Sequence, residues 1–104
     1  EPPTDTSCYH CHQVAEKSLK AFLIYKRIPA PRVHDLVELT NLCVKQDAEF
    51  HRIKEAASIL NRYYIEARYP PDEPLIYPLT EAKKALELAH QILNFAKAKT
   101  MVNK

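Results

Sequence analysis

The residues best equipped for chemistry lie near the start of the chain, where two cysteines and a histidine share one predicted helical face. Cys8, Cys11 and His12 occupy positions i, i+3 and i+4. Zinc is held in proteins by about four cysteine, histidine or carboxylate ligands in tetrahedral geometry, and only three are local here. Cys43 or His34 could in principle supply the fourth. Because the paired motif that normally completes such a site is absent, we expect no metal and interpret Cys8 and Cys11 as small core residues.

A polar ridge follows on the same predicted helix. Gln13, Glu16, Lys17 and Lys20 recur at three- and four-residue steps, so their side chains form a continuous line. One interpretation is structural, because a Glu16–Lys20 pair at i, i+4 stabilises a helix by about 0.3 kcal/mol. The other interpretation is that the ridge lines a polar cleft or a dimer surface. The sequence leaves both open.

Two later segments carry further candidate site residues. His34 precedes a predicted helix that starts at Asp35, and its imidazole could carry a proton near neutral pH or simply contribute to the helix entry. Arg62, Arg68 and Tyr69 lie where another predicted helix ends. Arginine binds phosphate through a bidentate fork, and tyrosine stacks on a base or donates a hydrogen bond. Arg68 also has a structural explanation, because a cation near a helix C-terminus is favoured by the helix dipole.

Composition excludes several classes of function. With 104 residues the chain is one domain, and its 46% hydrophobic and 27% charged residues fit a folded globular protein. The chain contains no glycine, so it has neither a Walker loop nor a Rossmann fingerprint. An odd number of cysteines, three, without a secretory signal favours free thiols and a cytoplasmic location. The net charge of +2 is too small to indicate nucleic-acid binding by itself.

Hydrophobic periodicity predicts helices over residues 6–28, 35–45, 48–67 and 80–99, with an irregular proline-rich segment over 69–79. No strand alternation occurs. We therefore predict an all-α fold, a four-helix up-and-down bundle with a short extra helix, formed by residues 1–104 as a single domain.

Each predicted helix has a stripe of apolar residues that we expect to face the core. In order along the chain, the stripes are Cys8, Cys11, Ala15, Leu19, Phe22 and Leu23; Leu36, Leu39 and Cys43; Phe50, Ile53, Ala57, Leu60 and Tyr64; and Ala82, Leu86, Ala89, Leu93 and Ala96. The last stripe keeps a seven-residue repeat of alanine and leucine, which suits close helix–helix packing.

Three short motifs resemble the HEPN domain, a helical nucleotide-binding family. Residues 13–21 read Gln-x-Ala-Glu-Lys-x-Leu-Lys-Ala, residues 34–36 read His-Asp-Leu, and residues 63–70 read Tyr-Tyr-Ile-x-x-Arg-Tyr-Pro. In the family a further helix precedes the one with the first motif. Position 1 is Glu rather than Met, so we expect that helix upstream of Glu1.

The resemblance implies a dimerising bundle encoded beside a minimal nucleotidyltransferase, as one half of a two-component, toxin–antitoxin-like pair. It predicts a non-catalytic module, without a cofactor, that binds a nucleotide or pairs with that enzyme. The predicted nucleotide- or partner-binding surface comprises Gln13, Glu16, Lys17, Lys20, His34, Arg62, Arg68 and Tyr69.

Some branches of the family are metal-independent ribonucleases that use an arginine, four to six intervening residues and a histidine. Arg27 and His34 have this spacing, with six residues between them, but they precede the late helix that carries the family's pair. There, Arg62 is followed by Arg68, and an arginine stays protonated and cannot act as a base. The alternative hypothesis is therefore a ribonuclease toxin subunit built on Arg27 and His34. In related toxins a tyrosine beside the motif is adenylylated, and Tyr69 is the nearest one. A third hypothesis is a helical dimer that holds another protein.

Overall fold

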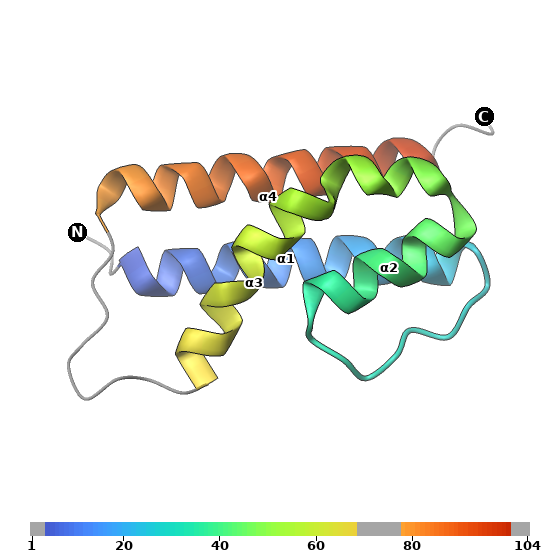
Figure 1. The fold of residues 1–104 in the computed structure, drawn as a ribbon, viewed down its shortest axis with the longest axis horizontal. Helices are drawn as coiled ribbons and strands as arrows, with labels where there is room; N and C mark the ends of the chain where they lie inside the picture. Colours follow the sequence, from blue (N-terminus) through green and yellow to red (C-terminus); the bar gives the residue numbers. More distant parts are fainter. Residues whose placement is uncertain (1–3, 69–77, 101–104) are drawn as a thin grey trace.

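The structure is a computed structural model that describes the backbone of residues 4–68 and 78–100 and the side chains of residues 8–66 and 78–100. It contains four α-helices, α1 (Thr4–Tyr25), α2 (Leu36–Gln46), α3 (Lys54–Arg68) and α4 (Leu79–Thr100), and a short 3₁₀ helix η1 (Ala48–Ile53) between α2 and α3 (Figure 1). No strand occurs in the two described ranges. The predicted all-α bundle of four helices with a short extra helix is confirmed. Most of the predicted irregular segment lies outside the described residues.

The helices do not alternate in direction, so their order differs from the predicted up-and-down order. The thiol of Cys43 in α2 donates to the carbonyl oxygen of Leu19 in α1 at 3.7 Å, and His34, just before α2, bonds to Glu16. The connection over 26–35 therefore returns along the bundle, and α2 then runs parallel to α1. Figure 1 shows α4 also running parallel to α1, with α3 opposed to both.

The end of α1 adopts a Schellman motif without glycine. The N–H of Ile28 bonds to the carbonyl oxygen of Leu23 at 2.9 Å, and that of Arg27 to Ile24 at 2.8 Å. Arg27 has φ 64°, in the left-handed region where a residue with a Cβ is disfavoured. Ile28 packs against the core, which is the apolar contact that usually accompanies this motif.

Several helix boundaries differ from prediction. The first helix begins at Thr4 and ends at Tyr25, against predicted bounds of 6–28. The third is not one continuous α-helix, because the side chain of Asp47 accepts from the N–H of Glu49 and starts a 3₁₀ turn before α3. The last helix begins at Leu79, one residue before the predicted start, and its first backbone bonds run to the carbonyl oxygen of Pro78.

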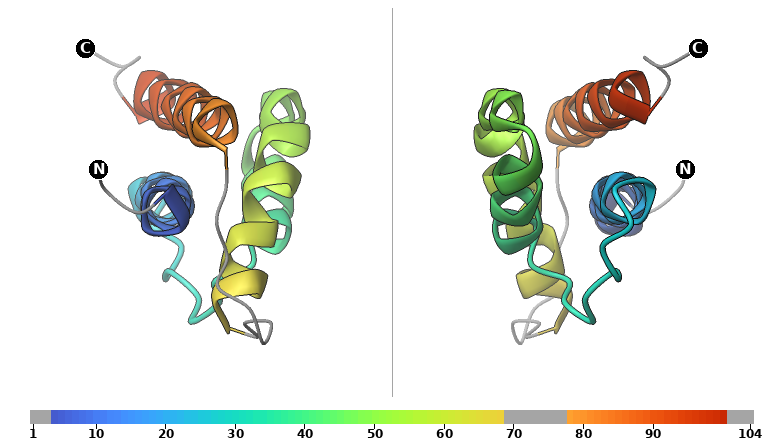
Figure 2. Two further views of the ribbon diagram at one scale, coloured as in Figure 1. Left: turned by 90° about the vertical axis from the view of Figure 1, so that its left-hand side faces the viewer. Right: turned by 90° about the vertical axis from the view of Figure 1, so that its right-hand side faces the viewer.

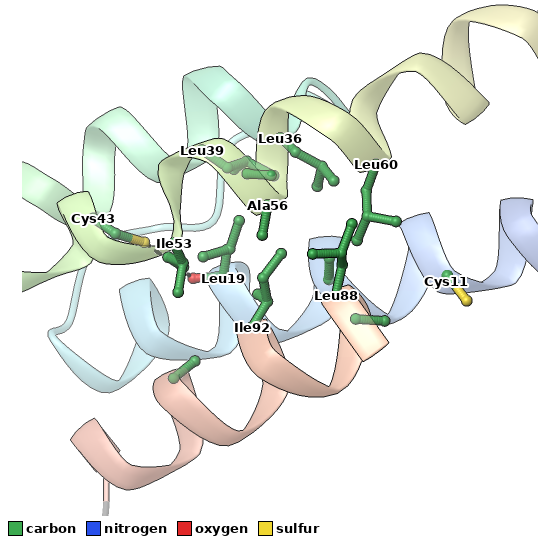
Figure 3. Packing of buried hydrophobic residues seen from close by; sticks show 14 of the residues in the cluster. Cys11, Leu19, Leu36, Leu39, Cys43, Ile53, Ala56, Leu60, Leu88 and Ile92 are labelled. Carbon is green, nitrogen blue, oxygen red and sulfur yellow. Dashed lines mark hydrogen bonds between the residues drawn. The ribbon is translucent and has the colours of Figure 1, made fainter. Parts of the chain in front are cut away.

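One hydrophobic core is shared by all the helices, and Figure 3 shows side chains from α2, α3 and η1 meeting those of α1 and α4. The predicted stripes of the first two helices are confirmed as buried, and so are four of the five residues in the third. The exception is Tyr64, which is half-buried, whereas the neighbouring Tyr63 is only 4% exposed. The core positions confirmed are Cys8, Cys11, Ala15, Leu19, Phe22, Leu23, Leu36, Leu39, Cys43, Phe50, Ile53, Ala57 and Leu60.

The predicted core stripe of the last helix is wrong at two leucines. Leu86 is 50% exposed and Leu93 is 37% exposed. The face of α4 that meets the core instead carries Ala85, Leu88, Ala89, Ile92 and Ala96. The helix has two adjacent apolar stripes. The stripe with the seven-residue repeat, which contains Leu86 and Leu93, lies at the edge of the core-facing surface, and we call it the edge stripe. That edge stripe is left without a helix against it in the described part of the chain.

Candidate functional site

A polar pocket of about 330 Å³ lies beside α1, facing the segment before α2 and the last turns of α3. Its walls are Tyr9, Gln13, Glu16, Lys17, His34 and Tyr64. Four of these were predicted as site residues, namely Gln13, Glu16, Lys17 and His34. The structure therefore brings together a ridge on one helix and a histidine about 20 residues further along the chain.

Glu16 is the centre of the polar contacts in this pocket. Its Oε2 accepts from Nζ of Lys20 at 3.0 Å and from Nδ1 of His34 at 2.9 Å, and its side chain is 14% exposed. Burial raises the pKa of Glu16, but the bonds from Lys20 and His34 lower it, and the net pKa lies below the ordinary value. The carboxylate is therefore charged at neutral pH and is balanced by neighbours within the site.

The ring of His34 is oriented by Glu16. Because a carboxylate only accepts hydrogen bonds, Nδ1 of His34 carries the proton in this contact. The ring's Nε2 is then the nitrogen that is available to accept a proton, and the side chain is 51% exposed. A carboxylate that fixes the tautomer of a histidine in this way is the arrangement found in general-base catalysis.

His12 is fully buried behind the pocket and does not line it. Its ring stacks on Tyr9 at 6.1 Å and on Tyr64 at 5.1 Å between centroids, with interplanar angles of 8° and 16°. Its Nε2 donates to the backbone carbonyl oxygen of His34 at 3.0 Å. Burial lowers the pKa of His12, although the charge of Glu16 opposes this, so the ring is neutral near pH 7.

The start of α2 fixes the backbone beside the pocket. Oδ1 of Asp35 accepts from two backbone N–H groups of the first turn, at 2.8 and 3.1 Å, as an N-cap. The remaining N–H, that of Leu36, donates to Oδ1 of Asn61 at 2.8 Å, and Nδ2 of Asn61 reaches Asp35 at 3.3 Å. Asn61 on α3 thus ties the residue after His34 to the bundle.

The arginines predicted for the site lie elsewhere or outside the described side chains. Arg62 forms an ion pair with Glu81 of α4, which also accepts from the hydroxyl of Tyr63 at 2.8 Å. Arg62 therefore faces α4 rather than the pocket. The backbone of Arg68 ends α3, but its side chain is outside the described residues, as is all of Tyr69.

Arg27 and His34, the candidate ribonuclease pair, are not close together. Arg27 lies at the end of α1, eleven residues beyond Glu16, the residue that holds His34. At 1.5 Å per residue this is roughly 16 Å along the helix axis. The spacing in sequence thus does not bring the two side chains to one place within this chain.

Four residues of the site were not predicted: Tyr9, His12, Asn61 and Tyr64. The sequence held a signal for Tyr9, because positions 9, 13, 16 and 20 continue the polar ridge at helical steps. Tyr64 and His12 had been assigned to the core and to a possible metal cluster. The described residues contain no group of three or more histidine, cysteine or acidic side chains placed to hold a metal, and Cys8, Cys11 and Cys43 are free and buried.

Comparison with known proteins identifies one family. The family model described as the HEPN domain matches residues 1–99. This range includes all three motifs noted above and every residue that lines the polar pocket. Neither the curated proteins nor the solved structures include a match. Among the described helices, none is both long and apolar enough to span a bilayer.

Proposed function

The chain belongs to the HEPN domain family, and from this premise we propose that it is a non-catalytic module that binds a nucleotide in the polar pocket. We propose further that it pairs with a minimal nucleotidyltransferase in a two-component, toxin–antitoxin-like system. The observation that carries the first part is the convergence of two tyrosines, an amide and a lysine around a pocket of about 330 Å³. That volume is at the lower end of small-molecule sites and suits one base with its sugar.

The chemistry of the pocket wall supports a phosphorylated, aromatic ligand. Lys17 is exposed and has no ion-pair partner among the described residues, so its ammonium group is available to a phosphate. Tyr9 and Tyr64 supply ring surface, and stacking on a base contributes about 1–3 kcal/mol. The charge of Glu16 does not oppose a phosphate strongly, because it is already balanced within the site.

Calorimetric titration with ATP, GTP, CTP and UTP tests the nucleotide proposal. Loss of one charge-assisted hydrogen bond costs about 1.5–3 kcal/mol, so Lys17→Ala should weaken binding about 10- to 100-fold. Lys84→Ala is the matched control, because Lys84 is also exposed but lies on α4, outside the pocket. If no nucleotide gives a heat signal, either alone or with the co-purified partner, the proposal fails.

Co-expression with a minimal nucleotidyltransferase encoded beside this chain tests the pairing. A complex that stays together through size-exclusion chromatography would support it, and independent elution at micromolar concentration would contradict it. The homodimer implied by the family is tested separately, by sedimentation of the isolated chain.

A ribonuclease is the second candidate, and the Glu16–His34 contact favours it. With its Nδ1 held by Glu16, His34 presents a base that could take the proton of a ribose 2′-hydroxyl. If the chain cleaves RNA, His34→Ala should abolish cleavage, whereas His51→Ala, at another exposed histidine, should not. A wild-type protein that leaves RNA intact removes this candidate.

A further inference from the structure

An apolar groove runs between α1 and α4, on a different side of α1 from the polar pocket. It has a volume of about 470 Å³. Figure 2 shows α2 and α3 lying on one side of the α1–α4 pair, so no described helix covers the other side. The groove and the polar pocket share no lining residue. The inference below is therefore independent of nucleotide binding.

The groove displays the edge stripe of α4. Leu79, Leu86 and Leu93 are 61%, 50% and 37% exposed, and Val14 of α1 faces them at 38%. The leucines recur every seven residues, which keeps them on one line along the helix. Small residues between them, such as Ala89, form the floor. Large side chains alternating with small ones along a helix provide the knobs and holes that receive another helix.

The rim of the groove is basic. His10 of α1 and Lys83 and His90 of α4 line it, and no acidic side chain does. A second copy docked by twofold symmetry would place the same patch against itself. Two Lys83 ammonium groups, one from each copy, would then lie in one apolar interface that no acidic lining residue balances, which is unfavourable. Acidic flanks on the occupant would instead be complementary.

We propose that this groove binds an amphipathic helix of another protein, with an apolar face of leucine-like side chains and glutamate or aspartate on its flanks. From Leu79 to Leu93 the groove spans fourteen residues of α4, roughly 21 Å, which accommodates a helix of about four turns. The apolar face fills the space between the exposed leucines, and the acidic flanks lie beside Lys83 and His90. Docking of a helix in a groove in this way is a recurrent mode of peptide recognition.

Two designed 15-residue helical peptides test the proposal. They share leucines at i, i+3, i+7, i+10 and i+14, and differ only in carrying glutamates or lysines on the flanks. We expect the acidic peptide to bind with a Kd at least tenfold lower, measured by fluorescence anisotropy. Leu86→Gln should weaken its binding at least tenfold. Ile65→Gln is the matched control, because Ile65 is also 50% exposed but lies on α3. Lys83→Glu should reverse the preference between the peptides.

Three outcomes would overturn the proposal. Equal binding of the two peptides would refute the charge complementarity. Absence of binding by both would refute the groove as a helix-docking site. A dimer in sedimentation that dissociates in Leu86→Gln but not in Ile65→Gln would assign the groove to a second copy. Because nucleotide titration uses the other side of α1, failure of one proposal leaves the other intact.

Discussion

Asn61 should be the most costly polar residue to truncate, because it completes the capping of α2 from a neighbouring helix. In Asn61→Ala the N–H of Leu36 loses its acceptor at 2.8 Å while it remains buried. An unsatisfied buried donor costs about 1–3 kcal/mol, and the longer contact with Asp35 adds about 0.5 kcal/mol. We therefore expect a loss of about 2.5 kcal/mol, a large share of the 5–15 kcal/mol typical of a small domain.

Urea unfolding followed by circular dichroism measures this loss. With a slope of about 1 kcal/mol per molar urea for a domain of this size, the midpoint should fall by about 2.5 M. Asn94→Ala is the control, because Asn94 is exposed on α4, and its midpoint should move by less than about 0.5 M. Equal midpoints for the two variants would refute the reasoning, since the N–H of Leu36 would then have another acceptor.

Three further predictions concern other parts of the bundle. Arg27→Gly should raise the free energy of unfolding by about 0.5–1 kcal/mol in the same assay, because glycine adopts φ 64° without strain; no gain would show that the turn is not strained. Burial lowers the pKa of His12 below 6.5. As the pH falls, His12 is therefore protonated in the unfolded chain at a higher pH than in the folded chain. The free energy of unfolding should therefore be highest above about pH 6.5 and should decrease below it. In His12→Gln the urea midpoint should change less between pH 7.5 and 5.5 than in the wild type. An equal change in both proteins would contradict this. Burial raises the pKa of Cys8 to about 11 and that of Cys43 to about 12. At pH 8 these thiols should react with iodoacetamide at least about 100-fold more slowly in the folded protein than in urea, and fast labelling of the native chain would count against their burial.

The fold was largely predictable because most helices have a single apolar stripe. On α1 every apolar residue at three- and four-residue steps from Cys8 to Leu23 proved to be buried. On α4 the same reasoning chose the wrong stripe, because Leu86 and Leu88 belong to two adjacent apolar stripes that overlap at Ala89. Only the position of α3 and α1 around α4 decides which repeat is covered. Periodicity identifies the helix, and tertiary packing selects the face.

The polar pocket was predictable where its residues share a helix and unpredictable where they do not. Gln13, Glu16 and Lys17 follow from helical spacing alone. Arg62 looked equally suitable, yet its partner Glu81 belongs to a helix that begins about 10 residues after α3 ends, and no local pattern indicates that pairing. His34 reaches the pocket only because the chain turns back after α1.

The way in which the connection is anchored determines what a substitution at His34 can reveal. The connection is held through main-chain atoms, because His12 donates to the carbonyl oxygen of His34 and Asn61 accepts from the N–H of Leu36. Neither bond uses the His34 side chain. In His34→Ala both anchors therefore persist, and Lys20 still balances the charge of Glu16. The imidazole can thus be removed with little effect on the bundle, so a change in nucleotide affinity or RNA cleavage in that variant would report on the pocket itself.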